Sequence, residues 1–175
     1  MAESRVLLTG EQIAGALDAM AERIAAATPA EARLALVGIR SRGEVLAGRL
    51  IAGLKTRRKG TVPLGVLDIT LYRDDLALKG GKARVRQTQI DFDVDDALIV
   101  LVDDVLYTGR TVRAALDALV DLGRPRAIRL AALIDRGGRE LPIQPDYVGV
   151  RLDEPVEHVK VRLVEPDGAD RVEVQ

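Results

Sequence analysis

Continuous runs of apolar residues recur along the chain at 34–39, 97–102 and 127–134. Each run is short and rich in branched side chains, which predicts buried strands of a parallel sheet that is covered on both faces. The segment 62–71 first alternates and then becomes continuously apolar, so it predicts a further strand. Shorter segments that alternate or contain Pro and Gly predict edge strands at 147–150, 159–164 and 171–174.

Apolar residues at helical spacing fill the intervals between these strands. A capping box at Thr9–Gln12 precedes a helix whose apolar face consists of Ile13, Leu17, Met20 and Ile24. A second capping box, of Ser41 and Glu44, predicts another helix, and a third helix is predicted to end at Gly123. The alternation of strands and helices predicts an α/β fold with a mainly parallel central sheet flanked by helices.

Composition narrows the class of protein. The 175 residues suffice for one domain with a substantial core, which must be aliphatic because 47% of residues are hydrophobic and only 2% aromatic. A formal net charge of -1 gives no general attraction to nucleic acid, although a local basic patch stays open. The absence of Cys excludes thiol chemistry and disulfides, and the single His158 has no partner for a serine triad. No signal or membrane-spanning run is evident, so we expect a cytoplasmic protein.

The most informative stretch is 98–111, LIVLVDDVLYTGRT. Two acids, Asp103 and Asp104, follow a buried strand, and ligands of open α/β sheets bind beyond the carboxyl ends of strands. In the turn that follows, Gly109 lets the backbone approach a ligand, and hydroxyls and amides at a helix N-terminus bind anions. Acids at a strand end are common and can have a purely structural role, but the whole stretch suits a phosphorylated sugar.

Two other loops offer anion-binding chemistry. The segment 39–43 contains Arg40 and Arg42 at the start of a helix, although many strand-to-helix turns carry Gly and Arg. The segment 72–75 leads into a loop with a double Gly and clustered cations at 79–86, which is either an exposed hairpin or a lid that excludes water. Alternation at 90–94 predicts that this loop returns as a strand. The basic run 55–59 is most simply a solvated helix end.

The stretch 98–111 resembles the signature with which type I phosphoribosyltransferases bind 5-phosphoribosyl-1-diphosphate (PRPP). Segments 72–76 and 135–137 narrow the resemblance to the PyrR family, pyrimidine-operon attenuation regulators that are also uracil phosphoribosyltransferases. The resemblance covers most of the chain and fades after about Val150. It implies a single domain, 1–175, with a core of about 30–136 and a small hood formed by about 1–12 and 137–175.

The resemblance also implies a reaction: uracil and PRPP give UMP and diphosphate with Mg2+ as cofactor. The implied catalytic residues are Asp103, Asp104 and Arg73, of which the two acids would also hold the metal through ribose and water. The implied PRPP-binding residues are Arg40, Ser41, Arg42, Gly43, Tyr72, Asp103, Asp104, Val105, Leu106, Tyr107, Thr108, Gly109, Arg110 and Thr111. The implied base-binding residues are Asp135, Arg136 and Gly137. No side chain is an obvious general base for uracil, so a backbone carbonyl or water would take its proton.

Two alternatives stay open beside this enzyme: a phosphoribosyltransferase for another base, such as hypoxanthine or guanine, and an RNA-binding regulator that senses UMP. Relatives carry basic or polar RNA-binding residues where this chain has Asp18, Glu22, Gly138, Gln144 and Val150. Three basic residues persist in this region, namely Arg136, Arg139 and Arg151. Since each lost phosphate contact weakens binding, we expect catalysis to be retained and binding of a leader mRNA to be weak or absent. The family also implies a homodimer or larger homo-oligomer.

Overall fold

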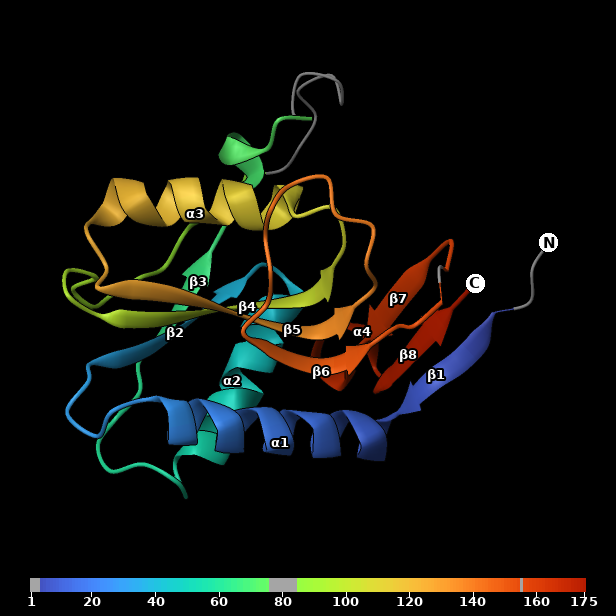
Figure 1. Cartoon of the computed structure of the whole chain (residues 1–175), viewed down its shortest axis with the longest axis horizontal. Coiled ribbons are helices and arrows are strands. Elements are labelled where there is room, and N and C mark those ends of the chain that lie inside the picture. Colours follow the sequence, from blue (N-terminus) through green and yellow to red (C-terminus); the bar gives the residue numbers. More distant parts are fainter. Residues whose placement is uncertain (1–3, 76–84, 155) are drawn as a thin grey trace.

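The computed structural model describes residues 4–75, 85–154 and 156–175 of the chain (Figure 1). Its centre is a sheet made of β2 Leu34–Ile39, β3 Leu64–Leu67, β4 Leu98–Leu106, β5 Ala127–Asp135 and β6 Tyr147–Arg151. These strands lie in the order β3-β2-β4-β5-β6, and all neighbours run parallel. The predicted α/β fold with a mainly parallel sheet is confirmed.

Helices cover both faces of this sheet. α1 (Gly10–Ala27) and α2 (Arg42–Leu54) pack on one face and α3 (Arg110–Leu122) on the other (Figure 1). α1 begins with the predicted capping box, in which Thr9 and Gln12 bond each other's backbone N–H. Its predicted apolar face, Ile13, Leu17, Met20 and Ile24, is buried. No helix in the described parts of the chain has the length and apolar content that a membrane span requires.

The start of α2 differs from the prediction. The Ser41 side chain makes no capping hydrogen bond. Glu44 instead pairs with Arg40, whose Nη1 lies 3.3 Å from Glu44 Oε2. The predicted capping box of Ser41 and Glu44 is therefore wrong, because a neighbouring guanidinium competes for the carboxylate. The peptide bond between Arg40 and Ser41 is cis.

The two terminal segments of the chain meet in a second, small sheet. It consists of β1 (Arg5–Thr9), β8 (Arg171–Val174) and β7 (Val159–Arg162) in antiparallel order, and the short helix α4 (Val164–Asp167) connects β7 to β8. Figure 1 shows this sheet beside the carboxyl ends of β5 and β6. It corresponds to the predicted small hood of terminal segments.

β6 belongs to the large sheet. We expected 147–150 as an edge strand around the hood, but β6 pairs in parallel with β5 and extends the core. Its first residue, Tyr147, is buried, and the Arg23 guanidinium of α1 lies 5.8 Å from the centre of the tyrosine ring. Arg23 also donates to the carbonyls of Asp146 and Val148, so α1 holds β6 in place.

Two predicted strands are shorter than expected or absent. β3 ends at Leu67, because Asp68 then accepts bonds from the N–H and hydroxyl of Thr70 and starts the turn Thr70–Tyr72. Among the described residues, 90–94 form no strand, and only the neighbouring Gln89 makes an isolated bridge to β3. Here the alternating apolar residues reflect packing: Ile90 and Phe92 contact the core beneath α3 without pairing.

Candidate active site

The acidic pair lies near the carboxyl end of β4. This strand runs to Leu106, so Asp103 and Asp104 lie among its last residues, whereas the prediction ended the strand before them. The Asp103 side chain is buried, with 6% exposure, and its Oδ1 accepts the N–H of Asp104 at 3.0 Å. Asp104 is partly exposed and its Oδ1 accepts the N–H of Val105 at 2.9 Å.

Burial decides the electrostatics of Asp103. Desolvation, together with the negative charge of Asp104, holds the pKa of Asp103 well above the ordinary aspartate value. A buried carboxylate beside a second carboxylate is stabilised by a cation or by hydroxyl donors that replace water. The site is therefore suited to ribose hydroxyls and to positive charge close to them.

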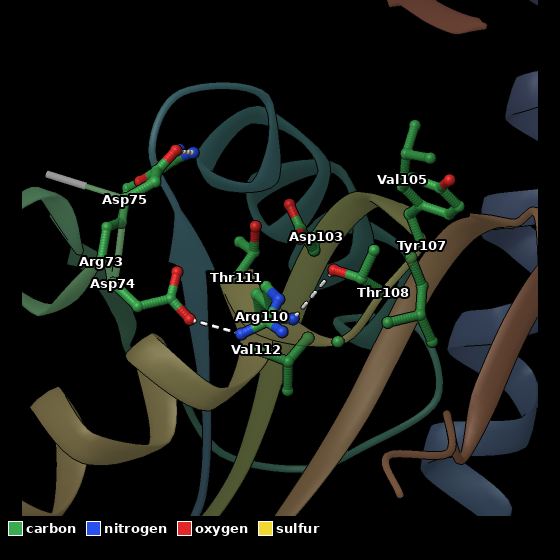
Figure 2. Close-up of a pocket in the computed structure, with 12 residues that line it drawn as sticks. Arg73, Asp74, Asp75, Asp103, Val105, Tyr107, Thr108, Arg110, Thr111 and Val112 are labelled. Carbon is green, nitrogen blue, oxygen red and sulfur yellow. Dashed lines mark hydrogen bonds and ion pairs between the residues drawn. The ribbon is translucent and has the colours of Figure 1, made fainter. Parts of the chain in front are cut away.

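A cavity of about 270 Å3 opens at this end of the strand (Figure 2). Its walls come from three elements: β4, the turn and first residues of α3, and the segment after β3. The lining residues are Arg73, Asp74, Asp75, Asp103, Val105, Leu106, Tyr107, Thr108, Gly109, Arg110, Thr111 and Val112. The cavity thus brings together Arg73, Asp103 and the predicted phosphate turn, while Asp104 lies outside its lining.

The turn predicted to bind phosphate has a glycine at the one position where its backbone requires it. Gly109 precedes α3 with a φ of 91°, a left-handed conformation that favours glycine. The N–H of Arg110 donates to the Thr108 hydroxyl at 3.3 Å. An ideal Cβ on Gly109 would lie 3.3 Å from Ile143, so the loop after β5 packs closely against the turn.

The arginines of the cavity already have acidic partners. Arg110 lies 2.7 Å from Asp74 Oδ2 and 2.6 Å from Glu140 Oε2. Arg73 pairs with Asp75 at 2.8 Å. Figure 2 shows 73–75 on one side of the cavity and Tyr107 on the other. We did not expect Asp74 and Glu140 at this site, since they lie 36 and 30 residues from Arg110 and no local pattern pairs them.

Tyr72 points elsewhere. Its hydroxyl donates to Asp121 of α3 at 2.8 Å, which places the ring against the helix and outside the cavity lining. The predicted lid residues at 79–82 and Arg84 lie outside the described residues. At the described end of that loop, the N–H of Arg86 donates to Asp68.

The second predicted anion loop, 40–43, reaches β4 directly beside the acidic pair. An ideal Cβ on Gly43 would lie 2.4 Å from the Val102 carbonyl oxygen and 3.4 Å from Asp103 Cα. Only glycine allows this close approach. The side chains of this loop are turned to other partners: Arg40 donates to the Gln87 carbonyl at 3.0 Å, and Arg42 binds Asp167.

The residues predicted to hold the base, Asp135, Arg136 and Gly137, lie outside the lining of this cavity and belong to a separate network at the end of β5. Asp135 has 3% exposure, and its Oδ1 accepts the Gly137 N–H at 3.1 Å and an Arg139 N–H at 2.7 Å. Arg151 lies 3.4 Å from its other oxygen. Burial alone would raise the pKa of Asp135, but the bond from Arg139 and the other donors hold that pKa below its ordinary value.

Arg136 supports Tyr107 and has little freedom to reach a ligand. Its guanidinium lies 3.9 Å from the centre of the Tyr107 ring, and its Nη2 donates to the carbonyls of Val156 and Glu157. An ideal Cβ on Gly138 would lie 2.5 Å from the same ring. The ring therefore stands between an arginine and a glycine, and it is 47% exposed.

Comparison with known proteins identifies the family. A model of the phosphoribosyl transferase domain matches residues 6–166. A protein named Bifunctional protein PyrR from Thermus thermophilus is 53% identical over 96% of this chain and 93% of its own. The protein of that name from Deinococcus radiodurans is 51% identical over 99% and 95%. This chain belongs to the PyrR family of phosphoribosyltransferases. The predicted family and class of enzyme are confirmed.

Solved structures support the same fold for this PyrR protein. A hypoxanthine phosphoribosyltransferase from Trypanosoma cruzi superposes with a TM-score of 0.75 at 21% identity and covers 99% of this chain and 96% of its own. A hypoxanthine-guanine phosphoribosyltransferase from Bacillus anthracis reaches a TM-score of 0.71 at 18% identity, with 98% of each chain covered. At this identity the likeness concerns the fold alone.

Phosphoribosyltransferases generally use Mg2+ with PRPP, and the acidic pair has the chemistry to accept it. Mg2+ prefers hard oxygen ligands and is often bound through one or two carboxylates plus substrate phosphates and water. The buried Asp103 carboxylate beside Asp104 supplies such oxygens. In the parts of the chain that the structure describes, no cluster of three or more acidic, His or Cys side chains forms a complete metal cage. The donor set fits an ion that arrives with its substrate.

Proposed function

We propose that this PyrR protein transfers the phosphoribosyl group of PRPP to uracil in the cavity around Asp103, giving UMP and diphosphate. The observation that carries the proposal is the single cavity wall shared by a buried carboxylate and the turn 108–111. One part suits ribose and the other suits its 5′-phosphate. Both parts line the same cavity at the end of β4. A single phosphoribosyl group bound there would contact the carboxylate and the turn together.

Each part of the cavity would have its own role. The N–H groups and hydroxyls of 108–111 would hold the 5′-phosphate, and Arg110 would exchange its carboxylate partners for phosphate. Asp103 and Asp104 would accept hydrogen bonds from the ribose hydroxyls. As the bond between ribose C1 and diphosphate breaks, C1 becomes positive, and the nearby carboxylates stabilise that charge. Uracil N1 then bonds to C1 and loses its proton to water or a backbone carbonyl.

The leaving diphosphate would be received by the backbone of 40–43, which lies against β4 beside Asp103. Asp103 and Asp104 would hold Mg2+ through ribose and water, and the bound ion would offset the negative charge of the diphosphate oxygens. Arg73 would complete the cavity from the segment after β3. Catalysis would then consist mainly of positioning and electrostatic stabilisation.

The test is a panel of radiolabelled bases with PRPP and Mg2+: uracil, cytosine, hypoxanthine and guanine. We expect UMP from uracil and no nucleotide from the other bases. Asp103→Asn serves as the control, since it should lower product formation about 100-fold or more while the protein stays folded. Formation of IMP or GMP in place of UMP would reject uracil as the substrate and favour the alternative base.

The second function of the family, regulation by RNA binding, has less support in this chain. Two of the three arginines expected to persist on the RNA surface have guanidinium groups engaged inside the protein. Arg136 contacts Tyr107 and two carbonyls, and Arg139 contacts Asp135 and three carbonyls. Of the three, Arg151 alone is well exposed, with 61% of its side chain accessible. We therefore propose that attenuator RNA binding is weak, because few phosphate contacts are left to contribute.

A titration of the protein with its own pyrimidine-operon leader RNA, with and without UMP, tests this second proposal at near-physiological salt. We expect binding that is weak and indifferent to UMP. Tight and sequence-specific binding that UMP strengthens would restore regulation as a main role of this protein.

A further inference from the structure

The first residue of α2, Arg42, is held by Asp167 in the C-terminal part of the chain, and we call this ion pair a clasp. Arg42 donates two parallel hydrogen bonds to Asp167, from Nε to Oδ2 at 3.1 Å and from Nη2 to Oδ1 at 2.8 Å. Asp167 ends α4, and its Oδ2 also accepts the N–H of Leu163 at 3.0 Å. Only 14% of the Asp167 side chain is exposed. A fork of this kind fixes the direction of the guanidinium more strictly than a single contact would.

The residue after Arg42, Gly43, lies directly against β4, the strand that carries Asp103. Gly43 lies so close to β4 that an ideal Cβ would be 2.4 Å from the Val102 carbonyl oxygen and 3.4 Å from Asp103 Cα. A continuous line of contacts therefore leads from Asp167 through Arg42 and Gly43 to Asp103. Helix α4 and the buried acid are thus linked through Arg42 and Gly43, two successive residues of the 40–43 loop.

A second clasp holds the same turn but does not touch the loop. Arg49, two helical turns further along α2, lies 2.5 Å from Glu165 and 2.8 Å from Asp170. Asp170 also accepts the Val164 N–H at 2.8 Å. The turn after β7 thus stays attached to α2 even when the bond to Arg42 is lost, so the two contacts can be perturbed separately.

We infer that Asp167 is a positioning residue for the reaction, which holds Arg42 and thereby keeps the backbone of 40–43 against Asp103, in place to receive diphosphate. This inference rests on the proposed function, since it assigns diphosphate to that loop. Arg42 contributes by orientation and not as a direct ligand, because its guanidinium forms a two-bond fork with the mostly buried Asp167, whereas the carboxylate partners of Arg110 are well exposed. N–H groups that are fixed before the substrate arrives need no reorganisation during the reaction.

The test compares Asp167→Asn with Glu165→Gln as a matched control. Each change removes one carboxylate of the same turn that pairs with an arginine of α2, but only Asp167 is linked to the loop. Steady-state kinetics are measured in both directions, with PRPP and uracil and with UMP and diphosphate. Thermal unfolding of each variant is followed in parallel.

For Asp167→Asn we expect the KM values for PRPP and for diphosphate to rise about tenfold, while the KM for uracil changes less than twofold. Glu165→Gln should leave all three KM values within about twofold of wild type. Arg42→Gln removes the same clasp from the other side and should reproduce the Asp167→Asn pattern, which keeps the test decisive if Asp167→Asn does not fold.

Two results would overturn the inference. Tighter binding of diphosphate in Asp167→Asn would mean that Asp167 withholds Arg42 from a ligand it contacts directly. Unchanged KM values would mean that the clasp is only structural. Wild type and Glu165→Gln are assayed alongside, so a lack of UMP formation in these two proteins would reject the proposed function and not the role of Asp167.

Discussion

The close approach of Gly43 to β4 gives a sharp prediction for Gly43→Ala. The new Cβ would lie 2.4 Å from the Val102 carbonyl oxygen, whereas close carbon–oxygen contacts in proteins are about 3.3 Å. Neither group can rotate away, since both belong to the backbone. The loop must therefore retreat from β4 at Val102 by close to 1 Å, which also displaces it relative to the neighbouring Asp103.

Such a displacement has a predictable magnitude. A shift of about 1 Å in a positioning group lowers turnover on the order of 100-fold, so we expect kcat/KM for PRPP to fall by about that factor. Overpacking costs about 1–3 kcal/mol, and the reduced freedom of the unfolded chain returns about 0.4–1 kcal/mol. The variant should thus fold, with a free energy of unfolding lower by about 1–2 kcal/mol.

Gly48→Ala is the matched control for this variant. Gly48 lies in the middle of the same helix, and an ideal Cβ there meets nothing within 4 Å. Alanine should stabilise the helix by about 0.5–1 kcal/mol and leave the kinetics unchanged. Urea unfolding and steady-state kinetics of both variants provide the measurements. Wild-type kcat/KM in Gly43→Ala would refute the idea that this contact positions the loop.

Three further predictions follow from the same geometry. Asp103→Asn should lower kcat about 100-fold or more through loss of one preorganised charge, with unchanged thermal unfolding; near wild-type rates would contradict its role. Arg73→Ala should lower kcat while PRPP affinity by calorimetry stays largely intact, because the rigid turns hold PRPP; a large loss of affinity at constant kcat would contradict this. The bond from Leu163 and the Arg42 guanidinium hold the pKa of Asp167 below its ordinary value, and Arg49 does the same for Asp170, so their stabilisation is present above about pH 4 and is lost as pH falls through the depressed values. The measurement is the urea midpoint between pH 5 and 2.5 in wild type and in a variant that lacks both acids. If the midpoint falls as strongly in the variant as in wild type, Asp167 and Asp170 do not cause the loss of stability.

Local pattern was sufficient for much of the site. Asp103 and the turn 108–111 are contiguous in sequence, and a strand followed by a helix places them together at one edge of the sheet. The structure accordingly brings them to one cavity. The same reasoning failed for Ser41, because a capping box considers only the cap and the third residue, whereas Arg40 competes for Glu44.

Tertiary structure decided the partners of the arginines. Arg42 meets Asp167 across 125 residues, and Arg110 meets Asp74 and Glu140 across 36 and 30 residues. Opposite charges are abundant in a chain with 26 basic and 27 acidic residues, so sequence offers many possible pairs and no means to choose among them. Charge identifies which residues can pair, but the choice depends on distances that exist only after folding.

The sequence by itself determined the fold class, the family and the strand that carries the acidic pair, because hydrophobic period and contiguous motifs are local properties that the backbone obeys directly. Only the tertiary structure decided that β6 joins the large sheet, that Arg136 and Arg139 turn inward, and that Gly43 touches β4. These features depend on burial and on contacts between distant segments. They arise when the sheet, its helices and the small terminal sheet pack together, and no window of sequence contains them.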